Sequence, residues 1–493
     1  QMCIRDWDVQ MAIAKGMNED VRVTVLGHVQ RGGSPTAFDR ILSTRMGVEA
    51  INAVMDAGPS AEPILIGINS NLITRLPLMT CVNTNQAINE AINTLNFDKA
   101  MELRGPAFES AFRTLRTLVR AMPHPPEEGQ PQLRIGIMNA GGPAPGMNAA
   151  VRAAVRLILD RGHEPVGIER GFRGLIRGET HGLHWMDVDG WAAIGGSELG
   201  TSRKIPKETE YYTIARQLED NKINALIVIG GWSGYESCIN LHNERTVFPA
   251  FDIPIVCVPA SFNNNLPGAD FSIGSDTALN SITEVVDKIK QSAVASNRCF
   301  VVEVMGRYCG YLALTSALAS GAERTYLHEE GVTLADLEQD IHFLNEGFRL
   351  GKRLGLLIRN EYSNQLYDTN FLAALFEEEG GDLFDVRMAV LGHLQQGGDP
   401  TPYDRIMATS LTAEAVDIVI NACEKPGAET PGVCIGMVDD QFTQTPFYSI
   451  MRQFDTEFQR PKQQWWLRLR PLARMLAQPG EEFGGNLVAE SEA

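Results

Sequence analysis

Five short segments of this sequence combine glycine, amide and basic residues in a way that suits a phosphorylated ligand. They are residues 139–148, 230–234, 259–270, 305–310 and 393–396. Glycine lets the backbone approach a phosphate, and a helix that starts after such a loop favours an anion. Asn263, Asn264 and Asn265 offer donors and acceptors to phosphate or sugar hydroxyls, although asparagine runs also form ordinary turns. Each segment alone also fits a tight turn, so the prediction depends on where the fold places them.

Strand-length apolar runs precede these segments. They occur at residues 133–138, 165–168, 225–229, 255–258, 299–304 and 355–359, and alternate with longer amphipathic stretches such as 147–160. Continuous apolar runs bounded by glycine and proline predict parallel strands that are covered on both faces. The predicted fold class is therefore α/β, with doubly wound parallel sheets. In such folds ligands bind at the carboxyl ends of the strands, which is where the polar segments fall.

One segment of the sequence is repeated. Residues 25–41 recur as residues 390–406, identical at 12 of 17 positions with an offset of 393 − 28 = 365. We interpret the chain as the tail of one unit followed by a complete second unit. The predicted boundaries are 1–94 for the first unit, 95–132 for an inter-unit linker, 133–455 for the second unit with two α/β subdomains, and 456–493 for a tail. Within the linker we expect one short helix over 103–120 and a proline-stiffened stretch over 123–131.

Composition limits the possible partners. The 493 residues carry a formal net charge of −18, which argues against body-wide attraction to nucleic acid or an anionic membrane. The eight cysteines show no CxxC or other metal-ligand spacing, which is typical of reduced thiols in the cytoplasm. The longest apolar runs are far shorter than a bilayer-spanning helix. We therefore expect a soluble cytoplasmic protein with no signal sequence at Gln1, no nucleic-acid partner and no membrane partner.

The ordered segments resemble the signature loops of the 6-phosphofructokinase family over roughly residues 1 to 475. The matching stretches are GGPAPGMNAAVR, GGWSG, SFNNN, MGRYCG and LGHLQQGG, and LGHVQRGGSPTAFDR resembles the sugar-phosphate motif of the family. The order and spacing of the loops resemble most closely the double-length enzymes of fungi and animals. That resemblance implies tandem duplicated halves, a catalytic first half and a regulatory second half. It also implies ATP-dependent phosphorylation of fructose 6-phosphate in glycolysis, and a homo-oligomer of four or more chains.

The second unit departs from the active pattern of the family at the positions that carry chemistry. Active halves have aspartates after the first paired glycines, in a GGDG metal segment and in an Ile-Asp-Asn-Asp base segment. Here Pro143, Trp232, Asn263 and Asn265 stand at those places. An asparagine cannot accept the proton of the sugar hydroxyl at neutral pH, and a tryptophan cannot hold Mg²⁺. We expect this unit to be catalytically silent and to have no metal ligands.

The resemblance also implies which residues bind ligands. In the first unit the residues that match the fructose 6-phosphate contacts are Arg22, His28, Val29, Gln30 and Arg31. In the second unit the residues that match a fructose 2,6-bisphosphate site are Arg203, Ser261, Phe262, Asn263, Asn264, Asn265, Arg298, Met305, Gly306, Arg307, Glu361, Arg387, His393, Leu394, Gln395, Gln396 and, more loosely aligned, Arg460. The ATP loop and the Mg²⁺ ligands of the complete enzyme are expected upstream of Gln1.

Two other functions fit the same residues. One is a stand-alone sugar-phosphate-binding regulatory protein derived from a kinase, which the intact substrate motif from His28 to Arg31 disfavours. The other is a diphosphate-dependent phosphofructokinase, because the loop that distinguishes the two phosphoryl donors belongs to the first half. An upstream reading frame holding GGDG and an Asp-Asn-Asp triplet would decide between these classes.

Overall fold

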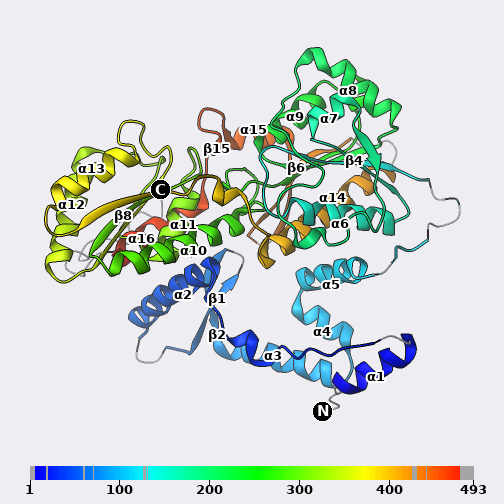
Figure 1. The fold of residues 1–493 in the computed structure, drawn as a ribbon. Helices are drawn as coiled ribbons and strands as arrows, with labels where there is room; N and C mark the ends of the chain where they lie inside the picture. The colour runs from blue at the N-terminus through cyan, green and yellow to red at the C-terminus, as the bar shows by residue number, and fades with distance from the viewer. Residues whose placement is uncertain are drawn as a thin grey trace.

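The described part of the chain contains two large β-sheets, each covered by helices on both faces, and two short two-stranded hairpins; one hairpin lies with a smaller group of helices from the first 120 residues (Figure 1). The computed structural model describes residues 6–17, 20–58, 61–69, 71–120, 122–125, 129, 131–424, 430–439 and 441–477.

The larger sheet has seven strands in the order β13-β12-β7-β6-β3-β4-β5. Its strands are β3 (Arg134–Ala140), β4 (Glu164–Ile168), β5 (Thr180–Gly182), β6 (Ala225–Gly230), β7 (Ile255–Pro259), β12 (Gly432–Val438) and β13 (Gln441–Pro446). The five central strands are parallel, and the edge strands β5 and β13 are antiparallel to their neighbours. The central strands are almost wholly buried, as the continuous apolar runs predict.

Helices cover both faces of this sheet. One face carries α6 (Met147–Asp160) and α14 (Pro402–Glu424), and the other carries α7 (Phe172–Arg177), α8 (Glu208–Asp220) and α9 (Trp232–Asn243) (Figure 1). By length and composition α14 alone among the described helices is apolar enough to cross a membrane. Its apolar residues, such as Leu411 and Val416, are buried against α6 and the sheet, which is how a core helix of this composition packs.

The smaller sheet has four parallel strands in the order β11-β8-β10-β9. The strands are β8 (Arg298–Val304), β9 (Arg324–Tyr326), β10 (Leu354–Asn360) and β11 (Asp385–Val390). One face is covered by α10 (Ser275–Val294) and α11 (Tyr311–Ser320), and the other by α12 (Leu334–Arg349) and α13 (Thr369–Gly380). The chain then ends in α15 (Phe447–Gln453), the short hairpin β14 (Phe454–Asp455) and β15 (Arg460–Pro461), and α16 (Arg470–Ala477).

The doubly wound α/β fold predicted from the sequence is confirmed. The predicted helix over 147–160 matches α6 residue for residue, and each predicted strand lies within one or two residues of an observed one. The two antiparallel edge strands of the larger sheet had no clear sequence signal, because edge strands carry mixed polar and apolar residues.

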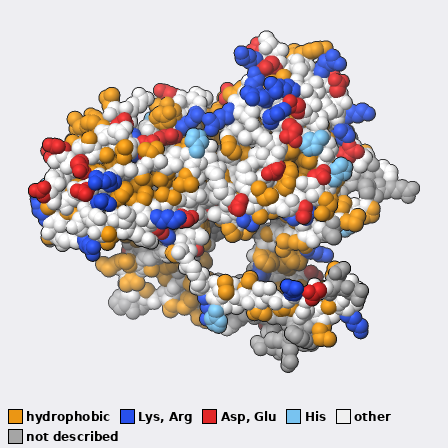
Figure 2. Space-filling view, viewed as in Figure 1, with side chains coloured by type: hydrophobic (Ala, Val, Ile, Leu, Met, Phe, Trp, Pro, Cys, Tyr) orange, Lys and Arg blue, Asp and Glu red, His pale blue; other side chains and the backbone are white. Residues whose placement is uncertain are grey.

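Residues 6–118 form separate helices and one hairpin. They are α1 (Asp6–Met17), α2 (Ala37–Asp56), β1 (Ile64–Asn69), β2 (Leu72–Pro77), α3 (Leu78–Asn93), α4 (Phe97–Arg104) and α5 (Pro106–Leu118). The short helix predicted over 103–120 is confirmed as α5, which starts three residues later because Gly105 adopts a φ of 92° and Pro106 starts the helix. Many apolar side chains of this segment are exposed, and Figure 2 shows them across the lower part of the molecule.

The sequence repeat is also a structural repeat. Arg40 donates from Nε to the carbonyl oxygen of Pro35 at 3.1 Å, and Arg405 donates to the carbonyl oxygen of Pro400 at 2.7 Å. These two pairs are related by the offset of 365 residues. The helices that carry them, α2 and α14, meet where Phe38 stacks on its own counterpart, Tyr403, with 5.7 Å between ring centroids. The two copies of the repeat therefore contact each other at this pair of counterpart residues.

Asp404 joins the repeat block to the start of α10. Its buried carboxylate, 1% exposed, accepts hydrogen bonds from the backbone nitrogens of Gly274 and Thr277, both at 2.8 Å. The Thr277 hydroxyl donates a third at 2.5 Å. Burial raises the pKa of Asp404 to about 7, against the lowering effect of these hydrogen bonds. The folded protein therefore holds a proton here that the unfolded chain releases near pH 4.

This raised pKa predicts how stability changes with pH. Between about pH 4 and pH 7 the folded state binds more protons than the unfolded state, so the free energy of unfolding falls as pH rises. We expect Asp404→Asn to flatten that slope in denaturant titrations at several pH values. Asp39→Asn, at the exposed counterpart in the first unit, is the matched control. Equal slopes for wild type and Asp404→Asn would contradict the assignment.

Candidate effector site

The polar segments that the sequence singled out all lie at carboxyl ends of strands. Residues 139–148 follow β3, 230–234 follow β6 and 259–270 follow β7 of the larger sheet, while 305–310 follow β8 and 393–396 follow β11 of the smaller one. The ends of the two sheets face each other, because the Cys309 thiol after β8 lies 3.9 Å from the carbonyl oxygen of Asn264 after β7. The fold therefore brings together loops of the two sheets, which are 45 residues apart in the chain at this contact.

The asparagine run is a structured turn rather than a flexible one. Asn264 takes a left-handed conformation with a φ of 52°, which asparagine tolerates better than most residues. Its buried side chain donates to the carbonyl oxygen of Asp270 at 2.9 Å and accepts from the Ser272 nitrogen at 2.7 Å. Asn265 accepts from the Ser261 hydroxyl at 2.7 Å. The Asn264 side chain thus holds the turn in a fixed conformation.

Asn263 has an unused hydrogen-bond acceptor. Its Oδ1 atom is buried and has no hydrogen-bond partner among the described residues. A buried amide oxygen without a partner carries a cost of about 1–3 kcal/mol, which a ligand hydroxyl can remove. The adjacent Phe262 is buried and packs in the same hydrophobic cluster as residues of α10 and α11. This packing anchors the loop to the core.

Glu361 and Gln395 organise the loop after β8. Glu361 accepts with Oε1 from the backbone nitrogens of Gly306 at 3.2 Å and Arg307 at 2.6 Å. Gln395 is fully buried; its Oε1 accepts from the Met305 nitrogen at 3.1 Å. The Gln395 side chain therefore positions this loop, while neighbouring His393 and Leu394 are exposed.

Arg359 is a supporting residue that sequence reasoning missed. It is 1% exposed and donates to Glu303 at 2.8 Å and to the Thr369 hydroxyl at 2.7 Å. It also donates to the carbonyl oxygen of Glu361 at 3.4 Å, which fixes the turn that presents this carboxylate. The sequence contains one signal for this role, which is a lone arginine near the end of an apolar strand. A charged side chain that is buried there needs hydrogen-bond or ion-pair partners.

The C-terminal hairpin lies across these loops. Gln459 accepts with its carbonyl oxygen from Asn265 at 2.9 Å and with Oε1 from Arg307 at 3.4 Å. Arg460 is largely buried and pairs with Glu329 at 3.1 Å, and it also donates to the carbonyl oxygen of Tyr308. The hairpin therefore bridges the loops of both sheets, and Arg460 is held by the protein as part of that bridge.

Arg203 lies beside the first glycine loop. The backbone nitrogen of Gly141 donates to the carbonyl oxygen of Ser202 at 2.8 Å, and the Thr201 hydroxyl donates to Gly141 at 3.0 Å. A side chain at Gly142 would come within 3.1 Å of the Arg203 guanidinium. Glycine at 142 thus leaves room for an exposed cation over the loop.

Trp232 occupies the start of α9, where the sequence comparison places a metal-binding aspartate. Its indole stacks on Phe454 of the hairpin, with 3.3 Å between ring centroids and 11° between the ring planes. Pro143 stands in the first glycine loop. No group of three or more His, Cys, Asp or Glu side chains that could hold a metal occurs in the described part of the chain. At the start of α9 the second unit thus has a stacked pair of aromatic side chains, whereas a magnesium site needs carboxylate oxygens there.

Arg298 and Arg387 lie away from the other predicted effector residues. Arg298 starts β8, and seven residues of strand, about 23 Å, separate it from Met305 at the other end. Arg387 pairs in register with Phe300 on the adjacent strand, and both arginines lie within 4 Å of Asp385. The structure therefore places these two cations at the opposite end of the smaller sheet.

The first unit repeats the local geometry of this motif. Residues Gly27–Arg31 form a 3-10 turn, as do Gly392–Gln396 in the second unit. Arg22 pairs with Asp20 at 3.4 Å, which matches the Arg387 and Asp385 pair. His28, Val29, Gln30 and Arg31 are all exposed. Residues 20–25 pair with no strand among the described residues, whereas their counterparts form β11.

Known proteins share this sequence and fold. A family model described as Phosphofructokinase matches residues 6–54 and 134–419. ATP-dependent 6-phosphofructokinase, muscle type, of Canis lupus familiaris is 41% identical over 479 residues, covering 95% of this chain and 61% of that protein. ATP-dependent 6-phosphofructokinase of Dictyostelium discoideum is 43% identical over 453 residues, covering 91% of this chain and 54% of that protein.

A solved structure agrees with these matches. Phosphofructokinase from Saccharomyces cerevisiae superposes with a TM-score of 0.91 at 35% identity, over 96% of this chain and 65% of that one. The chain thus spans about three fifths of the length of the curated relatives. The family model, the relatives and the shared fold agree with the loop geometry, and the chain belongs to the phosphofructokinase family.

Proposed function

We propose that this chain is part of an ATP-dependent 6-phosphofructokinase, and that its second unit binds fructose 2,6-bisphosphate as an allosteric effector. One observation supports the proposal: the loops that resemble the sugar-phosphate loops of the family converge where the two sheets meet, while Trp232 and Asn263 stand where the resemblance implies a metal ligand and a base. A site that keeps its binding loops and lacks its catalytic groups is suited to recognise a sugar phosphate without converting it.

The charges of the site support an anionic ligand. A carboxylate about 4 Å from a phosphate repels it by roughly 4 kcal/mol at an effective dielectric of 20, so asparagines at 263 and 265 remove that penalty. Arg203, Arg307 and His393 are exposed cationic or ionisable groups on the loops. Figure 2 shows further Lys and Arg side chains gathered over α7, α8 and α9, although the net charge is −18.

Catalysis in the complete enzyme belongs to the first unit in this proposal. Arg22 and the residues from His28 to Arg31 bind fructose 6-phosphate there, together with ATP and Mg²⁺ held by other residues of that unit. Magnesium neutralises the phosphates during transfer when it is bound. The described residues of the second unit do not fit a magnesium site, because Trp232 stands where the ligand would be. We place this glycolytic enzyme in the cytoplasm.

The names of the relatives favour ATP over diphosphate as the donor. The two relatives described above, at 41% and 43% identity, are both named ATP-dependent enzymes. A stand-alone regulator would have no use for the substrate motif, which the first unit keeps with Arg31 where the second unit has Gln396. We therefore keep the enzyme subunit as the proposed function, and the other two classes as the alternatives.

Arg298 and Arg387 support a homo-oligomer of four or more chains. These cations lie at the far end of the smaller sheet, so they can complete an effector site only on a partner chain. The edge strand β11 that carries Arg387 also exposes Met388 and Val390, which is typical of an interface strand. A ligand that contacts two chains couples its own binding to the relative rotation of the subunits. Through this rotation, effector binding in a catalytically silent unit can change the activity of a catalytic unit.

An effector site completed by a partner chain predicts the effect of removing one of its arginines. Arg387→Ala is expected to weaken fructose 2,6-bisphosphate binding by about 2–3 kcal/mol, as for a lost hydrogen bond to a charged group. Calorimetry on the 493-residue protein measures this, with Arg216→Ala on the exposed face of α8 as the control. If Arg387→Ala binds fructose 2,6-bisphosphate as tightly as wild type, the role of Arg387 is wrong. If wild type does not bind it at all, the effector site is wrong. If wild type binds it only with Mg²⁺, metal-free recognition is wrong.

A further inference from the structure

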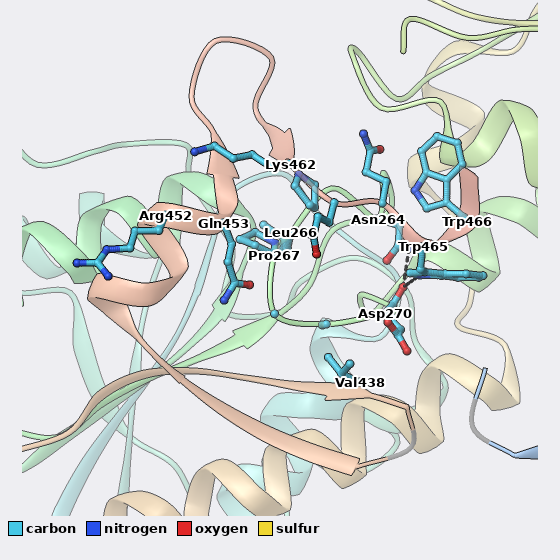
Figure 3. Close-up of a pocket in the computed structure, with 15 residues that line it drawn as sticks. Asn264, Leu266, Pro267, Asp270, Val438, Arg452, Gln453, Lys462, Trp465 and Trp466 are labelled. Atoms are coloured by element: carbon cyan, nitrogen blue, oxygen red, sulfur yellow. Dashed lines mark hydrogen bonds between the residues drawn. The ribbon is translucent and has the colours of Figure 1, made fainter. Parts of the chain in front are cut away.

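The C-terminal hairpin, β14 and β15 with the turn between them, borders a cavity at its base. Figure 3 shows the hairpin rising from Gln453 and Lys462, and the Lys462 backbone nitrogen donates to the carbonyl oxygen of Gln453 at 2.9 Å. A cavity of about 620 Å³ separates residues 461–466 from residues 264–270. The base of the hairpin is therefore not packed on this side, and its position depends on specific contacts elsewhere.

Arg460 fastens the hairpin to the smaller sheet. Its Nη1 atom lies 3.1 Å from Oε1 of Glu329 and 3.0 Å from Nδ1 of His328, and it donates to the carbonyl oxygen of Tyr308. Glu329 also accepts from the backbone nitrogen of Gly310 at 3.0 Å. Tyr308 and Gly310 belong to the loop after β8, which is part of the candidate effector site. Arg460 therefore ties the hairpin to that loop.

His328 can take part in this contact only while its imidazole is neutral. A guanidinium donates hydrogen bonds and accepts none, so Nδ1 of His328 must be the acceptor. Protonation would place a hydrogen on Nδ1 and a second positive charge 3.0 Å from Nη1 of Arg460. The imidazole contacts the rings of Tyr308 and Phe458, each at 4.8 Å between centroids, which hold its orientation. A protonated His328 would therefore lose this bond and repel Arg460.

The charged and titratable groups around His328 come from three segments. Arg460 and Asp455 lie on the hairpin, the Tyr308 phenol is on the loop after β8, and Glu329 is the next residue of the chain. Burial, and after it the charge of Arg460, lowers the pKa of His328, against the raising effect of Asp455. Burial raises the pKa of Glu329. His328 is therefore neutral near pH 7 in the docked hairpin.

We propose that protonation of His328 releases Arg460 from the loop after β8, so that the hairpin is docked near pH 7 and opens as the pH falls toward 6. The docked state binds fewer protons at His328 than the open state, in which the imidazole titrates near its ordinary value of about 6.5. Docking is therefore strongest above about pH 6.5 and weakens below it. The stacking of Phe454 on Trp232 holds the other end of the hairpin, so the turn and β15 move.

Opening of the hairpin would also affect the candidate effector site. The carbonyl oxygen of Gln459 in the hairpin turn accepts from Asn265, and its Oε1 accepts from Arg307. Both contacts are lost when the hairpin opens. A ligand that binds the loops in their docked arrangement binds more weakly to the open form. The expected loss of effector affinity at acid pH, unlike the opening itself, rests on the proposed function.

Hydrogen–deuterium exchange of residues 454–461 in the 493-residue protein tests the proposal. After correction for the intrinsic pH dependence of exchange, wild type should exchange about threefold faster at pH 6 than at pH 7.5. His328→Gln, whose amide oxygen can accept from Arg460 but does not titrate, should show no such change. His342→Gln, at an exposed position of α12, is the matched control and should behave as wild type. Equal pH dependence in wild type and His328→Gln would overturn the proposal.

Two features of the experiment exclude other causes. The Asp404 proton makes the whole protein more stable as the pH falls through this range, so a general loss of stability predicts the opposite change. If His328→Gln opens the hairpin at both pH values, the pKa of His328 in wild type decides instead. Exchange of its C2 hydrogen, followed by mass spectrometry, measures that pKa. A pKa below about 6.5 supports the proposal, and a pKa at or above this value overturns it.

Calorimetry with fructose 2,6-bisphosphate separates the hairpin from the effector function. The phosphates of the ligand titrate near pH 6 themselves, so the measured quantity is the difference between wild type and His328→Gln. Wild type should lose about threefold more affinity than the variant between pH 7.5 and pH 6. If hairpin exchange depends on His328 as expected while the ligand does not bind at all, the proposed effector function fails and the pH-dependent docking stands.

Discussion

Asn263→Asp is expected to weaken fructose 2,6-bisphosphate binding by about a thousandfold. The new carboxylate would stand about 4 Å from a phosphate group, where like charges repel by roughly 4 kcal/mol at an effective dielectric of 20. Every 1.4 kcal/mol corresponds to a factor of ten in affinity. The partly buried position of Asn263, whose Oδ1 is shielded from water, keeps solvent from screening the charge fully.

Calorimetry at two salt concentrations checks this prediction. Asn243→Asp, at the exposed end of α9, adds the same charge away from the loops and should leave the affinity unchanged. Raising the salt concentration should restore only part of the lost affinity. Salt screens two charges that are shielded from water less than it screens two charges at the surface. An Asn263→Asp protein that binds as tightly as wild type would show that the ligand phosphates do not approach this loop.

The 493-residue protein is expected to transfer no phosphoryl group from ATP to fructose 6-phosphate. Enzymes of this kind turn over at about 1 to 1,000 per second, and we expect at least a thousandfold less. The second unit lacks a base, since the Asn263 amide accepts no proton at neutral pH, and it lacks a metal ligand at Trp232. Residues 1–94 contain the substrate motif without a glycine-rich phosphate loop.

A coupled assay for ADP release measures this turnover. Fructose 2,6-bisphosphate binding by the same preparation is the control, because it shows that the second unit is folded and competent. Turnover in the ordinary range, with Mg²⁺ and both substrates present, would contradict the silent assignment of the second unit. Turnover that Asn263→Ala abolishes would place the chemistry in that unit directly.

Much of the fold could be predicted from the local pattern of apolar and polar residues. The alternation of buried strands with amphipathic helices predicts α6 and the central strands to within one or two residues, because burial on both faces demands continuous apolar runs. The repeat of residues 25–41 likewise predicts two units, and both copies form the same 3-10 turn and the same arginine contact. The predicted helix over 103–120 starts three residues before α5, since helical periodicity continues on both sides of Gly105.

The sequence by itself determined the family and the fold class, because these depend on residue type at ordered positions, and it predicts that the second unit is catalytically silent. Only the tertiary structure decided how the candidate residues are used. It buries Gln395 and Phe262 as supports, engages Arg460 with Glu329, and stacks Trp232 on Phe454. It also separates Arg298 from Met305 by the length of β8. The physical reason is that the direction of a side chain and its long-range partners follow from strand register and packing, which the local sequence pattern does not specify.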